Sequence, residues 1–153
     1  MEKIYTKFGD KGNTNLLYGG RVRKTDPHCV AFGTVDEANS ALGLARSLSK
    51  DQWVRDRLME VQKDLFTVGA ELATKPELRV LLLEHFPIVT EEMTTRLEAL
   101  IDEISVQITL PKSFIVPGGS PASAAIDIGR SAWRGAEGEA IQLLDLKELG
   151  NDE

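Results

Sequence analysis

The chain has 153 residues, a formal net charge of −6 and 42% hydrophobic residues, so we expect one domain, residues 1–153, with its own core. The negative charge argues against a nucleic-acid partner. The single cysteine, Cys29, excludes an internal disulfide and fits a reducing compartment. The sequence shows no leader-like N-terminus and no apolar run of about 20 residues, so we predict a cytoplasmic protein without a membrane partner.

The charge is distributed unevenly along the chain. Residues 1–24 carry a net charge of +4, and the rest of the chain carries −10. A small basic segment on an acidic body suits a compact anion such as a nucleotide polyphosphate. A solvated basic arm has the same composition and is the alternative.

The first 25 residues are predicted to be irregular and glycine-rich, with a brief strand at Ile4–Thr6. Residues 6–14 (TKFGDKGNT) contain two lysines, Lys7 and Lys11, and two glycines, Gly9 and Gly12. Glycine lets backbone N–H groups approach a phosphate closely, and lysine adds positive charge, so this composition suits a nucleotide-binding loop. The spacing is neither that of a P-loop nor that of an EF-hand loop, and a plain surface loop is the alternative.

Helical periodicity dominates the rest of the chain. Asp26 and Pro27 are typical of a helix start, and Asp51 is the predicted cap of a second helix, which ends before Lys75 and Pro76. Apolar residues recur at spacings of three and four in both segments. The predicted stripes are Val35, Ala38, Leu42, Ala45 and Leu48 in the first helix, and Val54, Leu58, Val61, Leu65, Val68 and Leu72 in the second.

A connection with room for a turn of helix is predicted at residues 80–86. Thr90 is the predicted cap of a third helix, whose apolar stripe runs from Met93 to Ile104, and residues 106–110 are interpreted as its fraying end.

A fourth helix is predicted to begin at Ser120–Pro121 and to run to about Leu149, with Gly150 as its C-cap. Arg130, Arg134 and Glu137 follow one another at spacings of four and three, so they share one helical face. No strand pair is evident. The predicted fold is therefore an all-α bundle of four to five helices with an irregular N-terminal segment.

Three motifs, in order along the chain, resemble the PduO-type ATP:cob(I)alamin adenosyltransferases. Ile4–Gly12 (IYTKFGDKG) resembles that family's Y-T-[KR]-x-G-D-x-G, and Gly33–Gly43 (GTVDEANSALG) resembles G-T-x-D-E-L-N-S-x-x-G. Phe114–Ser120 (FIVPGGS) resembles F-I-L-P-G-G-[ST]. Each motif is moderately specific, but all three at these separations are highly specific, and together they cover nearly the whole chain.

The resemblance implies a ferritin-like helical bundle that assembles as a homotrimer with active sites between subunits. It implies transfer of the 5′-deoxyadenosyl group of ATP to the cobalt of reduced cobalamin, with release of triphosphate. Cobalt(I) is the nucleophile, so the protein supplies position and electrostatics. ATP and cobalamin are then the substrates, and Mg²⁺ accompanies ATP without protein side chains as ligands. A cobalamin reductase and an adenosylcobalamin-dependent enzyme are the protein partners that fit this reaction.

The resemblance also implies which residues bind ATP. Lysines and N–H groups of the N-terminal loop, residues 1–25, would neutralise the triphosphate leaving group. Arg134 would contact the nucleotide phosphates, and Glu137 would lie near the ribose or orient a partner. The implied ATP-binding set is Thr6, Lys7, Phe8, Gly9, Thr14, Lys24, Arg134 and Glu137.

Two further roles follow from the resemblance. Phe114 resembles the aromatic residue that displaces the lower axial ligand of cobalamin, so Arg134, Lys7 and Phe114 are the predicted catalytic residues. Arg130 resembles an arginine that pairs across the subunit boundary with the aspartate at Asp36. A core position for Phe114 and a purely structural Asp36–Arg130 pair are the alternatives.

The chain departs from the family's pattern at two places. The fourth-helix pattern A-R-[ST]-x-x-R-R-A-E-R reads GRSAWRGAEG over residues 129–138, so Gly135 and Gly138 replace two arginines and weaken the helix. Family members continue into a further helix, which we expect to be missing here, leaving an apolar face exposed. The alternative function is a degenerate member that binds ATP or cobalamin without turnover, as a carrier, regulator or scaffold.

Overall fold

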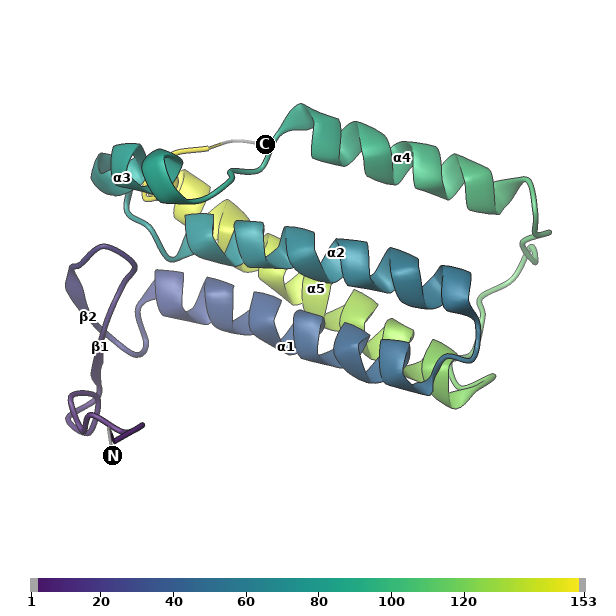
Figure 1. Ribbon diagram of the computed structural model, residues 1–153, viewed down its shortest axis with the longest axis horizontal. Coiled ribbons are helices and arrows are strands. Elements are labelled where there is room, and N and C mark those ends of the chain that lie inside the picture. The colour runs from purple at the N-terminus through teal and green to yellow at the C-terminus, as the bar shows by residue number, and fades with distance from the viewer. Residues whose placement is uncertain (1–2, 152–153) are drawn as a thin grey trace.

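The computed structural model describes residues 3–151, so the outermost residues of the predicted domain lie outside the described part. The described residues form five α-helices, one short 3₁₀ helix and one two-stranded sheet (Figure 1). The all-α bundle with an irregular N-terminal segment is therefore confirmed. No helix within residues 3–151 is long and apolar enough to cross a membrane.

A small antiparallel hairpin interrupts the N-terminal segment. β1 (Asn13–Asn15) pairs with β2 (Arg21–Arg23), and Thr14 lies opposite Val22. The predicted strand at Ile4–Thr6 is wrong, because these residues are exposed and belong to no strand. The true strands have three mainly polar residues each, so they lack the apolar alternation that identifies a strand.

The first two helices begin where the sequence predicts. α1 (Pro27–Leu48) is capped by the Asp26 carboxylate, which accepts a hydrogen bond from the His28 N–H at 3.0 Å. α2 (Gln52–Leu72) is capped by Asp51, which accepts from the N–H groups of Trp53 and Val54. Such caps satisfy N–H groups that have no partner within the helix. The core between the helices is formed by Ala31, Val35, Leu65, Leu72, Ala136 and Leu143.

The segment predicted as a connection is mostly helical. The 3₁₀ helix η1 (Pro76–Leu78) leads into α3 (Arg79–His85), and Leu82 of α3 is only 1% exposed. Seven residues are too few to show a helical period in the sequence. α4 (Glu91–Ser105) then begins after Thr90, whose side chain makes no capping hydrogen bond to the helix.

α5 (Pro121–Asp145) begins with a capping box between Ser120 and Ser123, as the cap-then-proline start predicts. Its predicted end is wrong: the helix stops at Asp145, and Leu146 rather than Gly150 is the C-cap. Lys147 has a φ of 59°, which turns the chain away from the helix axis. Gly150 instead packs against α3, where an added Cβ would lie 2.9 Å from Arg79 Cδ.

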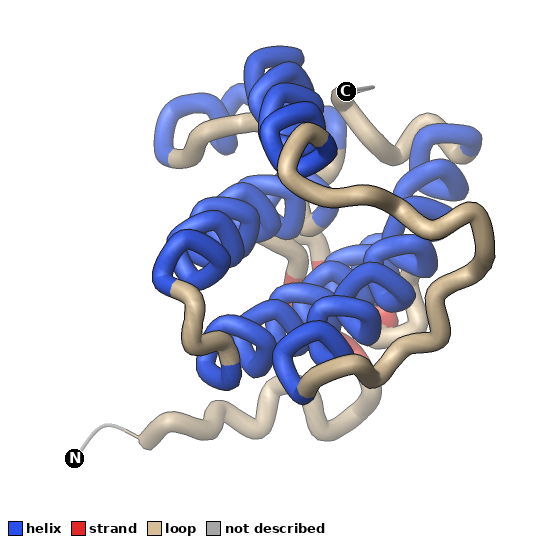
Figure 2. Tube along the Cα trace, turned by 90° about the vertical axis from the view of Figure 1, so that its right-hand side faces the viewer, coloured by secondary structure: helices blue, strands red, loops and turns tan. Residues whose placement is uncertain are grey.

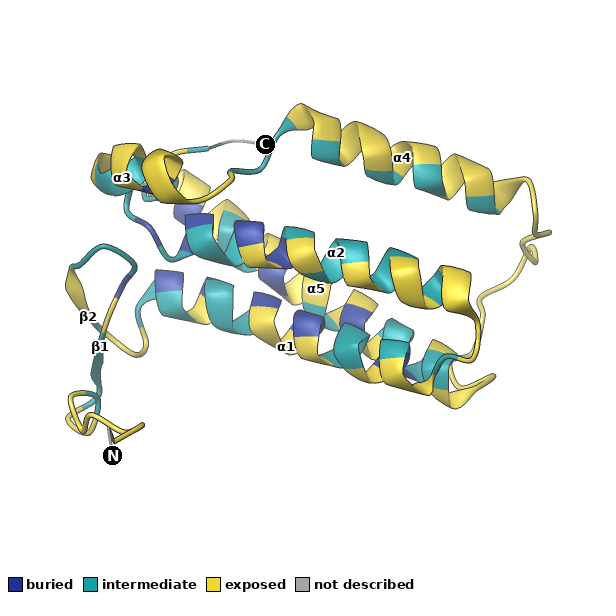
Figure 3. Ribbon diagram, viewed as in Figure 1, coloured by how far each residue is buried: buried dark blue, intermediate teal, exposed yellow. Residues whose placement is uncertain are grey.

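Three of the long helices form the packed body, and α4 lies apart from them. α1 packs against both α5 and α2, while α4 has no comparable packing against any described helix (Figures 1 and 2). No residue of α4 is buried, as Figure 3 shows. Its side-chain tie to α2 is Arg96, which forms an ion pair with Asp64 and lies 3.9 Å from a Glu60 oxygen.

The last turn of α2 receives hydrogen bonds from separate parts of the chain. The Leu72 carbonyl accepts from Nδ1 of the buried His28 at 2.6 Å, and the Ala73 carbonyl accepts from the Leu17 N–H at 2.8 Å. The last carbonyls of a helix have no partner within it, so they are available to other segments. The N-terminus of α1 and the hairpin are thereby attached to the same helix end.

Glu71, one residue earlier, attaches two more segments to that helix end. Its carboxylate is 7% exposed and accepts hydrogen bonds from the Val89 N–H and from Asn151 Nδ2, the latter at 2.9 and 3.2 Å. The Asn151 amide also donates to the Val89 carbonyl. The segment before α4 and the last described residues therefore meet at the end of α2.

The two unusual glycines of α5 allow a direct stability test. α5 continues through both, and an added Cβ at Gly138 would meet nothing within 4 Å. We expect Gly138→Ala to raise the free energy of unfolding by about 0.5–1 kcal/mol, because alanine restricts the unfolded chain without a clash. At Gly135 an added Cβ would lie 3.3 Å from Thr34 Cγ2, so Gly135→Ala should raise the free energy of unfolding by less than Gly138→Ala does. Urea unfolding measures both, and an unstabilised Gly138→Ala would contradict the account.

Candidate functional site

Residues 7–12 form a compact pair of turns at the base of the hairpin. The Asp10 N–H donates to the Lys7 carbonyl at 3.3 Å, and the Gly12 N–H donates to the Gly9 carbonyl at 3.1 Å. Lys7 and Gly12 both have positive φ, of 61° and 77°. Successive turns of this kind also occur in anion-binding loops, although the Asp10 and Gly12 N–H groups already donate within the turns.

Lys24 lies directly over this loop. A Cβ added at Gly9 would lie 3.0 Å from Lys24 Nζ, so the ammonium group lies against this glycine. The Lys24 N–H also donates to the Gly12 carbonyl at 3.0 Å. The structure thus brings together Gly9 and Lys24, which are separated by fifteen positions in the predicted ATP-binding set.

Two arginines of β2 hold the loop, and the sequence predicted only a charge contribution from them. Arg21 donates to the Phe8 carbonyl at 2.9 Å, and Arg23 donates to the Lys11 carbonyl at 3.2 Å. Their alternation along a strand beside a glycine-rich loop is the signal that was available in the sequence. The hairpin therefore supports the predicted nucleotide loop.

The basic charges of this segment have no acidic partners in the described chain. None of the salt bridges within residues 3–151 includes a residue before His28. Lys7 Nζ lies 5.7 Å from the Tyr5 ring centroid, and Phe8 is 73% exposed. Thr6 accepts a hydrogen bond from the Phe8 N–H, and Thr14 is held in β1. An uncompensated basic loop favours an anionic ligand.

The predicted residues of α5 lie on an exposed face. Arg134 and Glu137 make no hydrogen bond or ion pair with residues 3–151. Arg130 pairs with Asp127 at 2.9 Å rather than with Asp36, which is exposed on α1. The expected Asp36–Arg130 pair runs between subunits, so it stays a prediction.

Phe114 is not a core residue of the described chain. It is 103% exposed and lies in the long loop 106–120 with the exposed Ile115 and Val116. That loop joins the far end of α4 to the start of α5, at the opposite end of the molecule from the hairpin (Figures 1 and 2). Within one chain, the predicted cobalamin contact and the predicted ATP loop are therefore separated by the length of the bundle.

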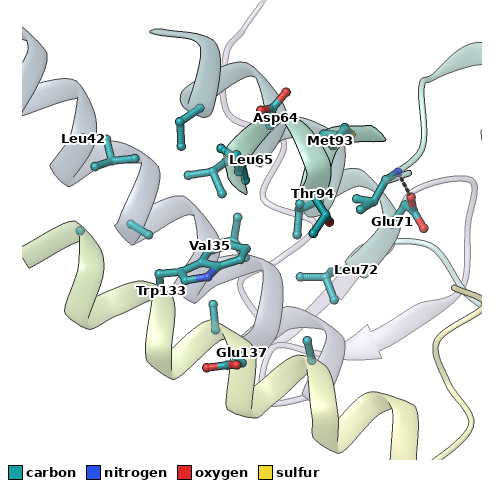
Figure 4. Close-up of a pocket in the computed structure, with 18 of the residues that line it drawn as sticks. Val35, Leu42, Asp64, Leu65, Glu71, Leu72, Met93, Thr94, Trp133 and Glu137 are labelled. Carbon is teal, nitrogen blue, oxygen red and sulfur yellow. Dashed lines mark hydrogen bonds between the residues drawn. The ribbon is translucent and has the colours of Figure 1, made fainter. Parts of the chain in front are cut away.

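A largely apolar cavity of about 620 Å³ lies between α1, α2, α4 and α5. Trp133 of α5 and Leu65 of α2 point into it, together with Met93 of α4 (Figure 4). Glu137 and Arg130 lie on its wall, whereas Phe114 and the N-terminal loop do not.

Cys29 is not an activated nucleophile. Burial, and to a smaller extent the nearby Asp26 carboxylate, raise the pKa of its thiol. The thiolate is the reactive form, and this shift disfavours it. Within residues 3–151, moreover, no group of three His, Cys, Asp or Glu side chains could hold a metal ion.

Comparison with known proteins decides the family. A family model described as cobalamin adenosyltransferase matches residues 4–152. The chain belongs to the cobalamin adenosyltransferase family. It is 39% identical over 152 residues to a corrinoid adenosyltransferase of Mycobacterium bovis, covering 98% of this chain and 77% of that protein. It is 37% identical over 151 residues to a corrinoid adenosyltransferase of Bacillus subtilis, covering 96% and 75%.

Solved structures of this adenosyltransferase family share the fold. A variant PduO-type ATP:corrinoid adenosyltransferase from Lactobacillus reuteri, complexed with cobalamin and ATP, superposes with a TM-score of 0.86. It is 35% identical, and the match covers 96% of this chain and 81% of that one. Another variant from the same organism, complexed with ATP, gives a TM-score of 0.84 at 34% identity.

The support of the loop by the hairpin can be tested by amide exchange. We expect Arg23→Ala to speed exchange of the Gly12 N–H roughly tenfold, because a charge-assisted hydrogen bond to the loop is lost. Lys3→Ala is the matched control: it removes the same charge, but no hydrogen bond from its side chain reaches the loop. Equal exchange in Arg23→Ala and wild type would show that the hairpin does not hold the loop.

Proposed function

We propose that this chain transfers the 5′-deoxyadenosyl group of ATP to the cobalt of a reduced corrinoid. The observation that carries this function is the match, over nearly the whole chain, to PduO-type structures complexed with cobalamin and ATP. In the reaction, cobalt(I) attacks C5′ of ATP, a Co–C bond forms, and the C5′–O5′ bond breaks. Triphosphate leaves with the bonding electron pair, so no side chain has to act as nucleophile.

The N-terminal loop is the proposed triphosphate site. Lys7 and Lys24 would neutralise charge on the leaving group, and loop N–H groups would donate to its oxygens. The absence of acidic partners for this segment within residues 3–151 supports the proposal. Thr6, Phe8, Gly9 and Thr14 complete the proposed ATP contacts, and Mg²⁺ would enter with the nucleotide rather than on side chains of this chain.

Arg134 and Glu137 are proposed to reach the same nucleotide from α5. Both are exposed and lack partners within residues 3–151, so both remain available for a ligand. Arg134 would bind phosphate oxygens, and Glu137 would lie near the ribose. Arginine suits the first role because its guanidinium can bind two phosphate oxygens at once.

A homotrimer is proposed because the family resemblance implies it, and active sites between subunits fit the separation of the two predicted substrate regions. The loop 106–120, which carries Phe114, and the N-terminal loop lie at opposite ends of one chain (Figure 1). Contact between the hairpin end of one subunit and the Phe114 end of another would bring the two together. The proposed Asp36–Arg130 pair would then fix that contact. Phe114 is fully exposed in one chain. In the assembly its ring would contact cobalamin and displace the lower axial ligand.

The remaining expectations concern the cellular setting. We place the protein in the cytoplasm, where a cobalamin reductase would supply cobalt(I) and an adenosylcobalamin-dependent enzyme would take up the product. Both classes of partner follow from the chemistry, because one supplies the reduced substrate and the other consumes the product.

The second candidate is a member that binds ATP or cobalamin without turnover. Gly135 and Gly138 favour it, because two arginines of the family's pattern are absent beside the proposed phosphate site. An anaerobic assay with ATP and fully reduced cobalamin separates the two candidates. Conversion of the cobalt(I) spectrum to that of an alkylcobalamin supports the enzyme, whereas ATP binding by calorimetry without conversion supports the second candidate.

Arg134→Ala tests the nucleotide placement. We expect kcat/KM to fall by about a hundredfold or more, because a donor to the developing charge is lost. The free energy of unfolding should change by less than about 0.5 kcal/mol, since the residue is exposed and makes no hydrogen bond or ion pair with residues 3–151. Arg55→Ala, which removes another exposed arginine on α2, is the matched control and should leave turnover unchanged. Normal turnover in Arg134→Ala would show the placement to be wrong.

A further inference from the structure

The turn of the hairpin, residues 16–20, docks against the end of α2 and against α3. We propose that Tyr18, at the centre of this turn, is a positioning residue for ATP. It would act by fixing the hairpin, and thereby the nucleotide loop, on the helical body. The inference rests on the proposed ATP site and extends it to a residue outside the three family motifs.

Backbone contacts attach the turn to the end of α2. The Leu17 N–H donates to the Ala73 carbonyl at 2.8 Å, and Leu16 is only 5% exposed. Within the turn, the Leu16 N–H donates to the Gly20 carbonyl and the Gly19 N–H donates to the Leu16 carbonyl. The turn is thus closed on itself and joined to the helix end by a single backbone hydrogen bond.

Tyr18 supplies the side-chain part of this contact. Its ring centroid lies 5.9 Å from that of His85 and 6.5 Å from that of Phe86, the latter in an edge-to-face arrangement. Its φ is 62°, an unfavourable region for a bulky residue. A conformation of this kind persists only where the surroundings hold it in place, and here the two aromatic partners are in position to do so.

The ring, rather than the hydroxyl group, makes the contact. The Tyr18 hydroxyl is buried and has no hydrogen-bond partner among residues 3–151. A phenylalanine at this position would keep both ring contacts and remove the unpaired polar atom. Tyr18→Phe is therefore a conservative variant that should preserve docking.

The hairpin transmits the position of the turn to the loop. β1 and β2 have three residues each, and an isolated two-stranded hairpin is at best marginally stable in water. At the other end of the hairpin, Lys24 bonds to Gly12, and Arg21 bonds to Phe8. Undocking the turn would leave this basic loop joined to the body only through residues 24–26, which lead into α1. Only the docked fraction of molecules would then present a formed ATP site.

The end of α3 provides the surface against which the Tyr18 ring packs. The His85 side chain lies against its own helix, with Nδ1 at 3.0 Å from the Leu81 carbonyl, and Phe86 follows directly. Both aromatic partners of Tyr18 thus come from the end of a short helix that is fixed to the body through the buried Leu82. The segment between α2 and α4 therefore serves as the receiving surface for the hairpin.

The test compares Tyr18→Ala with Tyr18→Phe. We expect Tyr18→Ala to raise the Kd for ATP, measured by calorimetry, by about threefold or more, because fewer molecules have a docked hairpin. The KM for the corrinoid, and kcat at saturating ATP, should stay within about twofold of the wild type. Amide exchange in residues 12–24 should be faster in Tyr18→Ala, and Tyr18→Phe should match the wild type in every measurement.

Phe86→Ala keeps the inference testable if Tyr18→Ala does not fold, and it should show the same pattern more weakly. Val80→Ala, on an exposed position of α3, is the control and should change nothing. A wild-type Kd for ATP in Tyr18→Ala, or an equal loss of ATP and corrinoid affinity, would overturn the inference while leaving the proposed function standing. A wild-type protein that neither binds nor uses ATP would overturn the proposed function itself.

Discussion

The carbonyl groups at the end of α2 are the constraint on which this structure depends. A helix end leaves carbonyls without partners, and here Leu72 and Ala73 offer theirs to the start of α1 and to the hairpin. The neighbouring Glu71 carboxylate binds the segment before α4 and the last described residues. Four segments that are distant in sequence therefore meet over three consecutive residues. The hairpin carries the proposed nucleotide loop. Among the described residues, the backbone hydrogen bond that joins this hairpin to the end of α2 runs from the Leu17 N–H to the Ala73 carbonyl.

Because the hairpin is attached to the end of α2, the proposed nucleotide loop lies at one end of the bundle. One end carries a basic loop whose charges have no acidic partners within residues 3–151, and the other carries the exposed apolar loop 106–120. A basic loop is suited to bind the triphosphate of ATP. An exposed aromatic side chain is suited to contact a corrinoid on the side of its lower ligand. The bundle holds these surfaces apart in one chain, so the proposed reaction requires the proposed site between subunits.

The sequence predicted most of the helical body, because capping residues and apolar spacing are local signals. Asp26, Asp51 and Ser120 each begin a helix as expected. The hairpin was missed because its stability comes from distant partners, such as Ala73 for Leu17. α3 was predicted only as a connection with room for a turn of helix, because seven residues show no helical period. Three motifs predicted the residues of the candidate site. These motifs do not indicate which other residues hold the site residues in place. For Arg21 and Arg23 the sequence offered only their alternation beside the glycine-rich loop. The role of Tyr18 depends on contacts with a distant segment, which no spacing in the sequence encodes.

Subunit complementation tests the shared site most directly. Lys7→Ala damages the proposed ATP end, and Phe114→Ala damages the proposed corrinoid end. The two variants are unfolded together, refolded together and assayed anaerobically for adenosyl transfer. If each site takes Lys7 from one subunit and Phe114 from another, random assembly restores about a quarter of the wild-type rate, since that fraction of sites has both intact residues. A mixture no more active than the two variants refolded separately would contradict the account.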